Sequence, residues 1–197
     1  MWRIEAEMRI FVAALLSFLI LQASLDATPR PFRQSADEPQ ANKIVAEGEI
    51  APAFSLPSQD GRPVSLAQYR GKWVILYFYP KDFTQGCTIE AHNFQKDEAQ
   101  YQAKNAVVLG VSLDSSDSHR QFCAKEGLNF KLLADDSSEV TKLYASLTEF
   151  QGKKYAARNT FIIDPSGVVR KIYRGVKPNG HSQEVLSALS ELQQSKA

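Results

Sequence analysis

The strongest constraint on the fold is an uncharged run that ends at a proline. Residues 73–79 read Trp-Val-Ile-Leu-Tyr-Phe-Tyr and are followed by Pro80. β-Branched and aromatic residues favour strands, and a continuous apolar run indicates a strand that is buried on both faces. Residues 106–112, Ala-Val-Val-Leu-Gly-Val-Ser, form a second run of this kind. The two runs predict a sheet with a buried centre.

Helical segments alternate with these strands. The composition predicts helices over 88–104 and 118–126. A capping box of Ser118 and Gln121 opens the second helix, and Gly127 closes it. Further elements are expected as strands at 53–56, 64–66 and 132–134, a helix at 137–147, a hairpin of strands at 160–163 and 168–173, and an amphipathic helix at 181–194. Alternation predicts parallel strands, and the hairpin adds antiparallel ones. The expected fold class is α/β, thioredoxin-like, with a mixed central sheet flanked by helices.

The first 27 residues differ from the rest of the chain. Residues 10–21 form an almost unbroken apolar run, with Arg9 before it and small residues after it. A run of this length is too short to span a bilayer comfortably, so the pattern predicts a signal peptide over 1–27. The pattern is cleaner if translation starts at Met8. An uncleaved membrane anchor and a buried helix are the alternatives.

The segment 28–47 is polar and contains several prolines, which predicts a linker between the leader and a domain over 48–197. A cleaved leader implies export to a periplasm or another extracytoplasmic space, with no stable membrane contact. An uncleaved leader implies a membrane-anchored domain. The formal net charge of +1 gives no indication of nucleic-acid binding.

The cysteines narrow the function. The chain has two, Cys87 and Cys123, with no Cys-x-x-Cys motif and no histidine at metal-ligand spacing from either. We therefore expect no metal, no cofactor and no thioredoxin-type dithiol site. One disulfide is not needed to stabilise a domain of this size, so the pair favours a redox role.

Cys87 follows the loop that joins the central strand to the first long helix. In a first helical turn, unpaired N–H groups and the helix dipole favour a thiolate, which attacks an O–O bond to give a sulfenic acid. Gly86 allows close approach of the backbone, and Thr84 can direct its hydroxyl towards the sulfur or a bound peroxide. Lys81 and Asp82 are expected to be solvated loop charges. The residues alone leave open a second interpretation, in which Cys87 is buried and inert.

The loop resembles the active-site loop of the peroxiredoxins, in particular the bacterioferritin comigratory protein or peroxiredoxin Q subfamily. The family pattern of proline, three residues, threonine, two residues and cysteine is matched by Pro80, Thr84 and Cys87. Further similar segments are Gly110-Val111-Ser112, Ser118-His119, Gly127-Leu128, Leu132-Leu133-Ala134-Asp135 and Arg158-Asn159-Thr160-Phe161-Ile162-Ile163-Asp164. The resemblance extends from about residue 48 to residue 192, nearly the whole expected domain.

The resemblance implies roles for four residues. Cys87 is the peroxidatic nucleophile, and Thr84 hydrogen-bonds the peroxide. Pro80 shields the thiolate from water. Arg158 holds the thiolate and polarises the peroxide. The chemistry of arginine agrees, because a permanent cation favours a thiolate and its fork of donors can steady a departing hydroxide. On position alone, Arg158 is an ordinary surface arginine at the start of a strand.

One position departs from the subfamily. Many members carry a resolving cysteine five residues after the peroxidatic one, where this chain has His92. We expect His92 to be a solvated helix-surface residue rather than a base that tunes the site.

An external thiol or Cys123 must then resolve oxidised Cys87. We favour Cys123, since some members place the resolving cysteine on that helix. A disulfide needs Cα atoms within about 7 Å, so local unwinding at Gly86 or Gly127 is expected. An inert, buried Cys123 is the alternative.

The expected activity is that of a thioredoxin-dependent thiol peroxidase acting on hydrogen peroxide and organic hydroperoxides. Cys87 forms a sulfenic acid, Cys123 condenses with it, and a thioredoxin-like reductant reopens the disulfide. The alternatives are a one-Cys peroxidase resolved by an external thiol and a non-catalytic redox sensor or binding protein on the same fold. Following the subfamily, we expect a monomer.

Overall fold

The computed structural model describes residues 45–195, so the expected signal peptide and most of the expected linker lie outside the described residues. The strands are β1 (Ser55–Pro57), β2 (Pro63–Ser65), β3 (Trp73–Phe78), β4 (Ala106–Ser112), β5 (Lys131–Ala134), β6 (Leu147–Phe150), β7 (Lys153–Ala156), β8 (Asn159–Ile163) and β9 (Val169–Arg174). The helices are α1 (Gln85–Ala103), α2 (Ser116–Glu126), α3 (Glu139–Leu143) and α4 (His181–Gln194), with a 3₁₀ turn η1 at Leu66–Tyr69. Within residues 45–195, none of the helices has the length and apolar character needed to cross a membrane.

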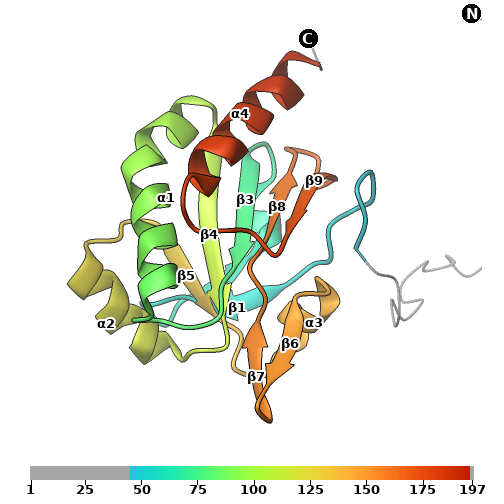
Figure 1. Cartoon of the computed structure of the whole chain (residues 1–197). Coiled ribbons are helices and arrows are strands. Elements are labelled where there is room, and N and C mark those ends of the chain that lie inside the picture. The colour runs from blue at the N-terminus through green and yellow to red at the C-terminus, as the bar shows by residue number, and fades with distance from the viewer. Residues whose placement is uncertain (1–44, 196–197) are drawn as a thin grey trace, which may run out of the picture. The chain divides into compact units, whose positions relative to one another are not determined.

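A five-stranded mixed sheet forms the centre of the domain, in the order β5-β4-β3-β8-β9 (Figure 1). Strands β3, β4 and β5 are parallel, whereas β8 and β9 are antiparallel to their neighbours. Every residue of β3 is buried, as the apolar run predicted. The predicted fold class, α/β with a thioredoxin-like mixed sheet flanked by helices, is confirmed.

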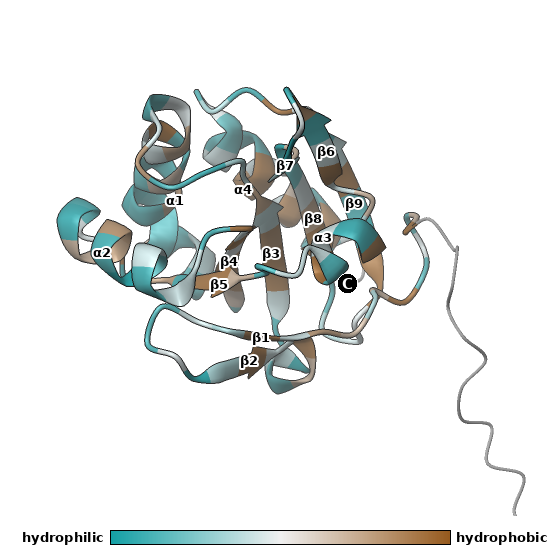
Figure 2. Ribbon diagram, turned by 90° about the horizontal axis from the view of Figure 1, so that it is seen from below, coloured by the Kyte–Doolittle hydropathy of each residue, from teal (hydrophilic) through white to brown (hydrophobic). Residues whose placement is uncertain are grey.

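The side chains of β3 alternate between two hydrophobic clusters, one on each face of the sheet. Ile75 and Tyr77 join a cluster with residues of α1, α2 and α4. Leu76 and Phe78 join the opposite cluster, with residues of β1, β2, η1 and α3. Figure 2 shows the hydrophobic colour concentrated on the central strands between the more polar outer elements. Both cysteines belong to the first cluster.

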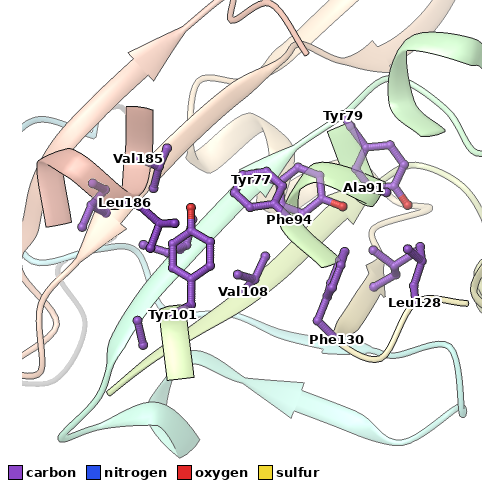
Figure 3. Packing of buried hydrophobic residues seen from close by; sticks show 14 of the residues in the cluster. Tyr77, Tyr79, Ala91, Phe94, Tyr101, Val108, Leu128, Phe130, Val185 and Leu186 are labelled. Carbon is purple, nitrogen blue, oxygen red and sulfur yellow. The ribbon is translucent and has the colours of Figure 1, made fainter. Parts of the chain in front are cut away.

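Stacked aromatic rings fill the first cluster next to α1. The ring of Tyr77 stacks on Phe94 at 4.7 Å and on Tyr79 at 5.4 Å between centroids (Figure 3). Gly110 of β4 leaves room for this stack. A Cβ at Gly110 would lie 2.8 Å from the Tyr77 hydroxyl oxygen and 2.6 Å from Leu132 Cδ2. The glycine in the second apolar run is therefore a packing requirement of the aromatic cluster.

Two predicted helix starts need correction. Helix α1 begins at Gln85, three residues before the predicted start, with Thr84 as its N-cap. The capping box predicted at Ser118 is wrong, because Ser115 caps α2 and accepts the N–H of Ser118 at 3.2 Å. Gly127 closes α2 as predicted, in the left-handed conformation at φ 66°.

The helix predicted over 137–147 is much shorter than expected. Helix α3 spans only Glu139–Leu143, and Ala145 adopts φ 48°, which ends the helical path. A hairpin of β6 and β7 follows, which the sequence did not predict. Its strands are largely exposed, with the Phe150 side chain 66% accessible, so they lack the apolar pattern that marks a buried strand.

The described domain begins before the expected boundary at residue 48. Val45 is buried, and Glu47 Oε1 accepts the N–H of Ile172 at 2.7 Å. Gly48 N–H donates to Val169 O at 2.8 Å. Residues 45–47, assigned to the linker from composition, are therefore packed along β9.

Candidate active site

The loop between β3 and α1 places Cys87 in the first turn of a long helix. Strand β3 ends at Phe78, and α1 starts at Gln85 after Thr84 as N-cap. The first four N–H groups of a helix lack an intrahelical partner, and the dipole makes this end positive. Cys87 is 1% exposed and carries a free thiol. The Cys87 side chain therefore lies at the positive end of α1.

Arg158 reaches Cys87 because of the way β8 pairs with β3. Phe78, the last residue of β3, is opposite Asn159, the first residue of β8. Arg158 precedes Asn159 and so lies beside the start of the active-site loop. Its Nη2 donates to Cys87 Sγ at 3.2 Å. The structure thus brings these two predicted site residues into direct contact, and such a contact stabilises a thiolate.

Glu90 is a further residue of this site, and it was not singled out from the sequence. Its Oε2 lies 2.5 Å from Arg158 Nη1, and its side chain is buried. Burial raises the pKa of Glu90 to about 7, although the Arg158 charge acts against this. Burial by itself would lower the pKa of Arg158, but the charges of Cys87 and Glu90 outweigh it and raise that pKa. The usable signal was spacing, since a residue three positions after Cys87 lies on the same helix face.

Gly86 provides the space for the guanidinium. A Cβ at this position would lie 2.8 Å from Arg158 Nη2, closer than an ordinary contact. The sequence suggested that Gly86 allows a close approach of the backbone. In the structure, the close approach is made by the Arg158 side chain.

Thr84 and Pro80 belong to the loop, but the structure shows no hydrogen bond from Thr84 to the sulfur. Thr84 is exposed, and its Oγ1 donates to Lys81 O at 3.0 Å. Pro80 is half-buried at the end of β3. Lys81 is exposed, as expected for a solvated loop charge. The loop therefore forms a compact turn that leads into Cys87.

The prediction that Asp82 is a solvated loop charge is wrong. Its side chain accepts hydrogen bonds from the Tyr79 hydroxyl at 2.7 Å and the Ser118 hydroxyl at 2.7 Å. It also lies 2.8 Å from His119 Nδ1. Burial tends to raise the pKa of Asp82, but these bonds and the His119 charge outweigh it and lower that pKa. The residue is 3% exposed and belongs to a buried cluster shared with α2.

Cys123 lies in the last turns of α2 and is 8% exposed. Burial raises the pKa of its thiol to about 11, so the group is protonated at neutral pH. His92, which occupies the alternative resolving position, lies on the surface of α1 with about half of its side chain exposed. Its Nε2 pairs with Glu126 Oε2 at 3.1 Å and so links α1 to the end of α2. The Cys123 thiol, which would have to react with oxidised Cys87, is therefore buried in the packed helix layer.

A thioredoxin-like fold with a buried cysteine in a first helical turn, bonded to an ion-paired arginine, defines a thiol-dependent oxidoreductase. Comparisons with known proteins then give the family. Residues 48–172 match the AhpC/TSA family. Peroxiredoxin Bcp of Bacillus subtilis is 39% identical over 149 residues, which cover 74% of this chain and 95% of that protein.

Two solved structures are similar over most of the domain. A cysteine-to-serine mutant of PrxQ from Xylella fastidiosa aligns with a TM-score of 0.73 and 33% identity, covering 77% of this chain and 99% of that one. The bacterioferritin comigratory protein of Xanthomonas campestris aligns with a TM-score of 0.67 and 35% identity, and the alignment covers 70% of this chain and 90% of that one. The chain belongs to the AhpC/TSA family and, within it, to the Bcp and peroxiredoxin Q group of peroxiredoxins, which are thiol peroxidases.

Proposed function

We propose that the chain reduces hydrogen peroxide and organic hydroperoxides at Cys87. The observation that carries this assignment is the hydrogen bond from Arg158 Nη2 to Cys87 Sγ. The other terminal nitrogen of the same guanidinium, Nη1, pairs with Glu90 Oε2. The bacterioferritin comigratory protein of Xanthomonas campestris has alkyl peroxide reduction activity, which supports organic hydroperoxides as substrates here. The Cys87 thiolate attacks the outer peroxide oxygen, the O–O bond breaks, and the departing alkoxide takes a proton from the medium.

The residues around Cys87 have distinct parts in this step. Arg158 is a permanent cation with donors on two nitrogens, so it can hold the thiolate and stabilise charge on the departing oxygen. Thr84 lies at the exposed edge of the loop, and rotation of its hydroxyl away from Lys81 O frees it to bind a peroxide oxygen. Pro80 limits the access of water from the β3 side of the loop.

We further propose that Cys123 resolves the sulfenic acid. The Cys123 thiol condenses with the Cys87 sulfenic acid, forming the S–S bond and releasing one water, and a thioredoxin-like dithiol then reduces the disulfide. Both cysteines contribute to the same cluster on one face of the sheet, which supports this pairing. The burial of Cys123 favours the second candidate, a one-Cys peroxidase resolved by an external thiol.

Two cysteine variants separate these possibilities. The purified chain is treated with one equivalent of hydrogen peroxide, its thiols are alkylated, and its mass is measured. Cys87→Ser should consume no peroxide, and unchanged consumption would exclude Cys87 as the nucleophile. Cys123→Ser should react once and stop as a sulfenic acid, whereas full turnover with thioredoxin would favour the one-Cys route. Slow peroxide reaction by the unaltered chain, with a protein partner captured on Cys87, would favour a redox sensor.

The proposal extends to the N-terminal segment. We propose that residues 1–27 are a cleaved leader, that residues 28–47 form mainly a linker, and that the peroxidase acts as a monomer outside the cytoplasm. The test is N-terminal sequencing of the protein recovered from fractionated cells, together with its mass by light scattering. A mature chain that starts near residue 28 in the extracytoplasmic fraction is expected. A chain that keeps its first residues and sediments with membranes would contradict cleavage.

A further inference from the structure

A buried hydrogen-bond cluster joins the active-site loop to the helix that carries Cys123. Asp82 of the loop accepts from the hydroxyls of Tyr79 and Ser118, each at 2.7 Å, and lies 2.8 Å from His119 Nδ1. Ser118 and His119 lie in the first turns of α2, whereas Cys123 lies in its last turns. The backbone N–H of Asp82 also donates to Asp114 Oδ2, at 2.9 Å, just before α2. One loop residue thus bonds to Ser118 and His119 in the first turns of α2 and to Asp114 just before the helix.

The burial of this cluster makes its bonds strong. His119 is 0% exposed and Asp82 is 3% exposed, so both side chains are removed from solvent. Hydrogen bonds to an ionised carboxylate are stronger than neutral ones, and a low local dielectric strengthens them further. His119 Nε2 has no hydrogen-bond partner within residues 45–195. Opening of α2 would hydrate that nitrogen, which lowers the free-energy cost of opening.

The next loop residue makes a second contact with the same helix. The ring of Phe83 packs against Phe122 at 5.2 Å between centroids, and Lys125 Nζ lies 5.5 Å from the Phe83 ring centre. Phe83 has φ 59°, a left-handed conformation that is costly for a large side chain. Because Cys123 directly follows Phe122, the loop contacts α2 immediately beside the second thiol.

We infer that Asp82 is a positioning residue for the second half of the reaction, acting as a latch on α2 that sets how fast Cys123 reaches oxidised Cys87. This inference rests on the proposed role of Cys123 as the resolving residue. Cys123 is buried in the packed state, so α2 must leave its position before the S–S bond can form. The bonds from Ser118 and His119 to Asp82 are among those that must break.

The latch has a chemical consequence at Cys87. Its sulfenic acid has two fates: condensation with Cys123, which releases water, or attack on a second hydroperoxide, which gives a sulfinic acid and an alcohol. A tighter latch slows the first route and so favours the second. Weakening the latch should therefore speed disulfide formation and protect Cys87 from overoxidation.

Three variants of the full chain test this. Ser118→Ala removes one bond to Asp82, and Asp82→Asn removes the charge. Arg120→Ala is the matched control, because Arg120 lies on the same helix in an exposed pair with Asp117. Each protein receives one equivalent of hydrogen peroxide, and disulfide formation is followed by acid quench, thiol alkylation and mass spectrometry. Excess peroxide then gives the sulfinic fraction. Amide hydrogen exchange reports the opening of α2 against that of β4.

We expect disulfide formation to be roughly tenfold faster in Ser118→Ala and faster still in Asp82→Asn, from the size of single hydrogen bonds to charged groups. The sulfinic fraction should fall in the same order, and exchange should rise in α2 but not in β4. General destabilisation of the fold would raise exchange in β4 as well. Arg120→Ala should match the unaltered chain.

Equal or slower disulfide formation in both latch variants, relative to Arg120→Ala, would overturn the inference. If Asp82→Asn does not fold, the comparison of Ser118→Ala with Arg120→Ala decides the matter. The failure of the proposed resolving role is a separate result: the unaltered chain would then form no disulfide between Cys87 and Cys123 at all. A disulfide that forms at the same rate in every variant refutes the latch alone.

Discussion

Arg158 Nη2 lies 3.2 Å from Cys87 Sγ, although the two residues are 71 positions apart in the sequence. The antiparallel pairing of β8 with β3 produces this contact, because it places the start of β8 beside the loop that leads to Cys87. The other nitrogen of the guanidinium is engaged by Glu90. Both terminal nitrogens of the Arg158 guanidinium therefore have a partner, one Cys87 and the other Glu90. The reactivity of the sulfur depends on this two-point arrangement as well as on the positive charge.

Replacing Arg158 by lysine should lower the rate of peroxide reduction even though the positive charge is kept. An ammonium group is a single point charge and cannot contact both Cys87 and Glu90 in the same way. We expect the second-order rate constant with hydrogen peroxide to fall by about 100-fold, the typical effect of losing one transition-state donor. Stopped-flow kinetics measure it, with Arg120→Lys as the control. A rate within a factor of about two of the original would contradict the bidentate role.

Replacing Gly86 by alanine should separate activity from stability. The added methyl would lie 2.8 Å from Arg158 Nη2, so the flexible guanidinium must move away from Cys87. Alanine favours a helix by up to about 1 kcal/mol over glycine, so thermal stability should hold or rise. The peroxide rate constant should fall roughly tenfold if one donor contact is weakened rather than removed. Gln85→Ala, on the exposed neighbour, is the control, and an unchanged rate in Gly86→Ala would refute the steric argument.

Glu90 should make the domain less stable as the pH rises through the weakly acidic range. Its pKa is raised from 4.5 to about 7 in the folded chain, so between these values the folded state binds a proton that the unfolded state has lost. The free energy of unfolding therefore falls from pH 4.5 to pH 7.

The contribution of Glu90 is isolated by comparing the unaltered chain with Glu90→Gln in urea denaturation across that pH range. The difference between the two curves should change by on the order of 3 kcal/mol, since each unit of pKa shift corresponds to about 1.4 kcal/mol. Both proteins contain His181, so its contribution to the pH dependence of the free energy of unfolding cancels in the difference. Burial lowers the pKa of His181, so that contribution has the opposite sign to that of Glu90. A difference that is flat with pH would show that Glu90 stays ionised throughout.

Replacing Gly110 by alanine should destabilise the fold without altering Cys87 directly. The new Cβ would meet Leu132 Cδ2 at 2.6 Å and the Tyr77 ring at 2.8 Å, inside a closely packed aromatic cluster. Overpacking of this kind costs about 1–3 kcal/mol. Urea denaturation should show a lower midpoint with an unchanged slope. A midpoint equal to that of the original chain would mean that the Tyr77 stack can rearrange.

The sequence predicted best the parts of the fold whose signal is local. The apolar runs at 73–79 and 106–112 predicted β3 and β4 almost to the residue, because strands buried on both faces show few polar positions. Strands β6 and β7 were missed, since exposed strands carry no such pattern. Ser118 has a side chain that suits a helix cap, but its hydroxyl donates to Asp82, 36 positions away in the sequence.

The site was predictable where it depends on a motif and unpredictable where it depends on packing. Cys87 and Arg158 were both named, and the structure brings them together. Glu90 and the burial of Asp82 were missed, because a charged residue in a sequence gives no sign of a partner supplied by another element. A buried carboxylate becomes visible only when the helix and strand that cover it are in place.

The two hydrophobic clusters divide the domain into parts with different dynamic demands. Cys87 and Cys123 both lie on the face covered by α1, α2 and α4, while the opposite face, beneath η1 and α3, contains neither. Any rearrangement that joins the thiols can then be confined to one cooperative unit, with the sheet as a rigid partition behind it. The far side can stay folded through every redox cycle and supply the template on which the opened helices repack.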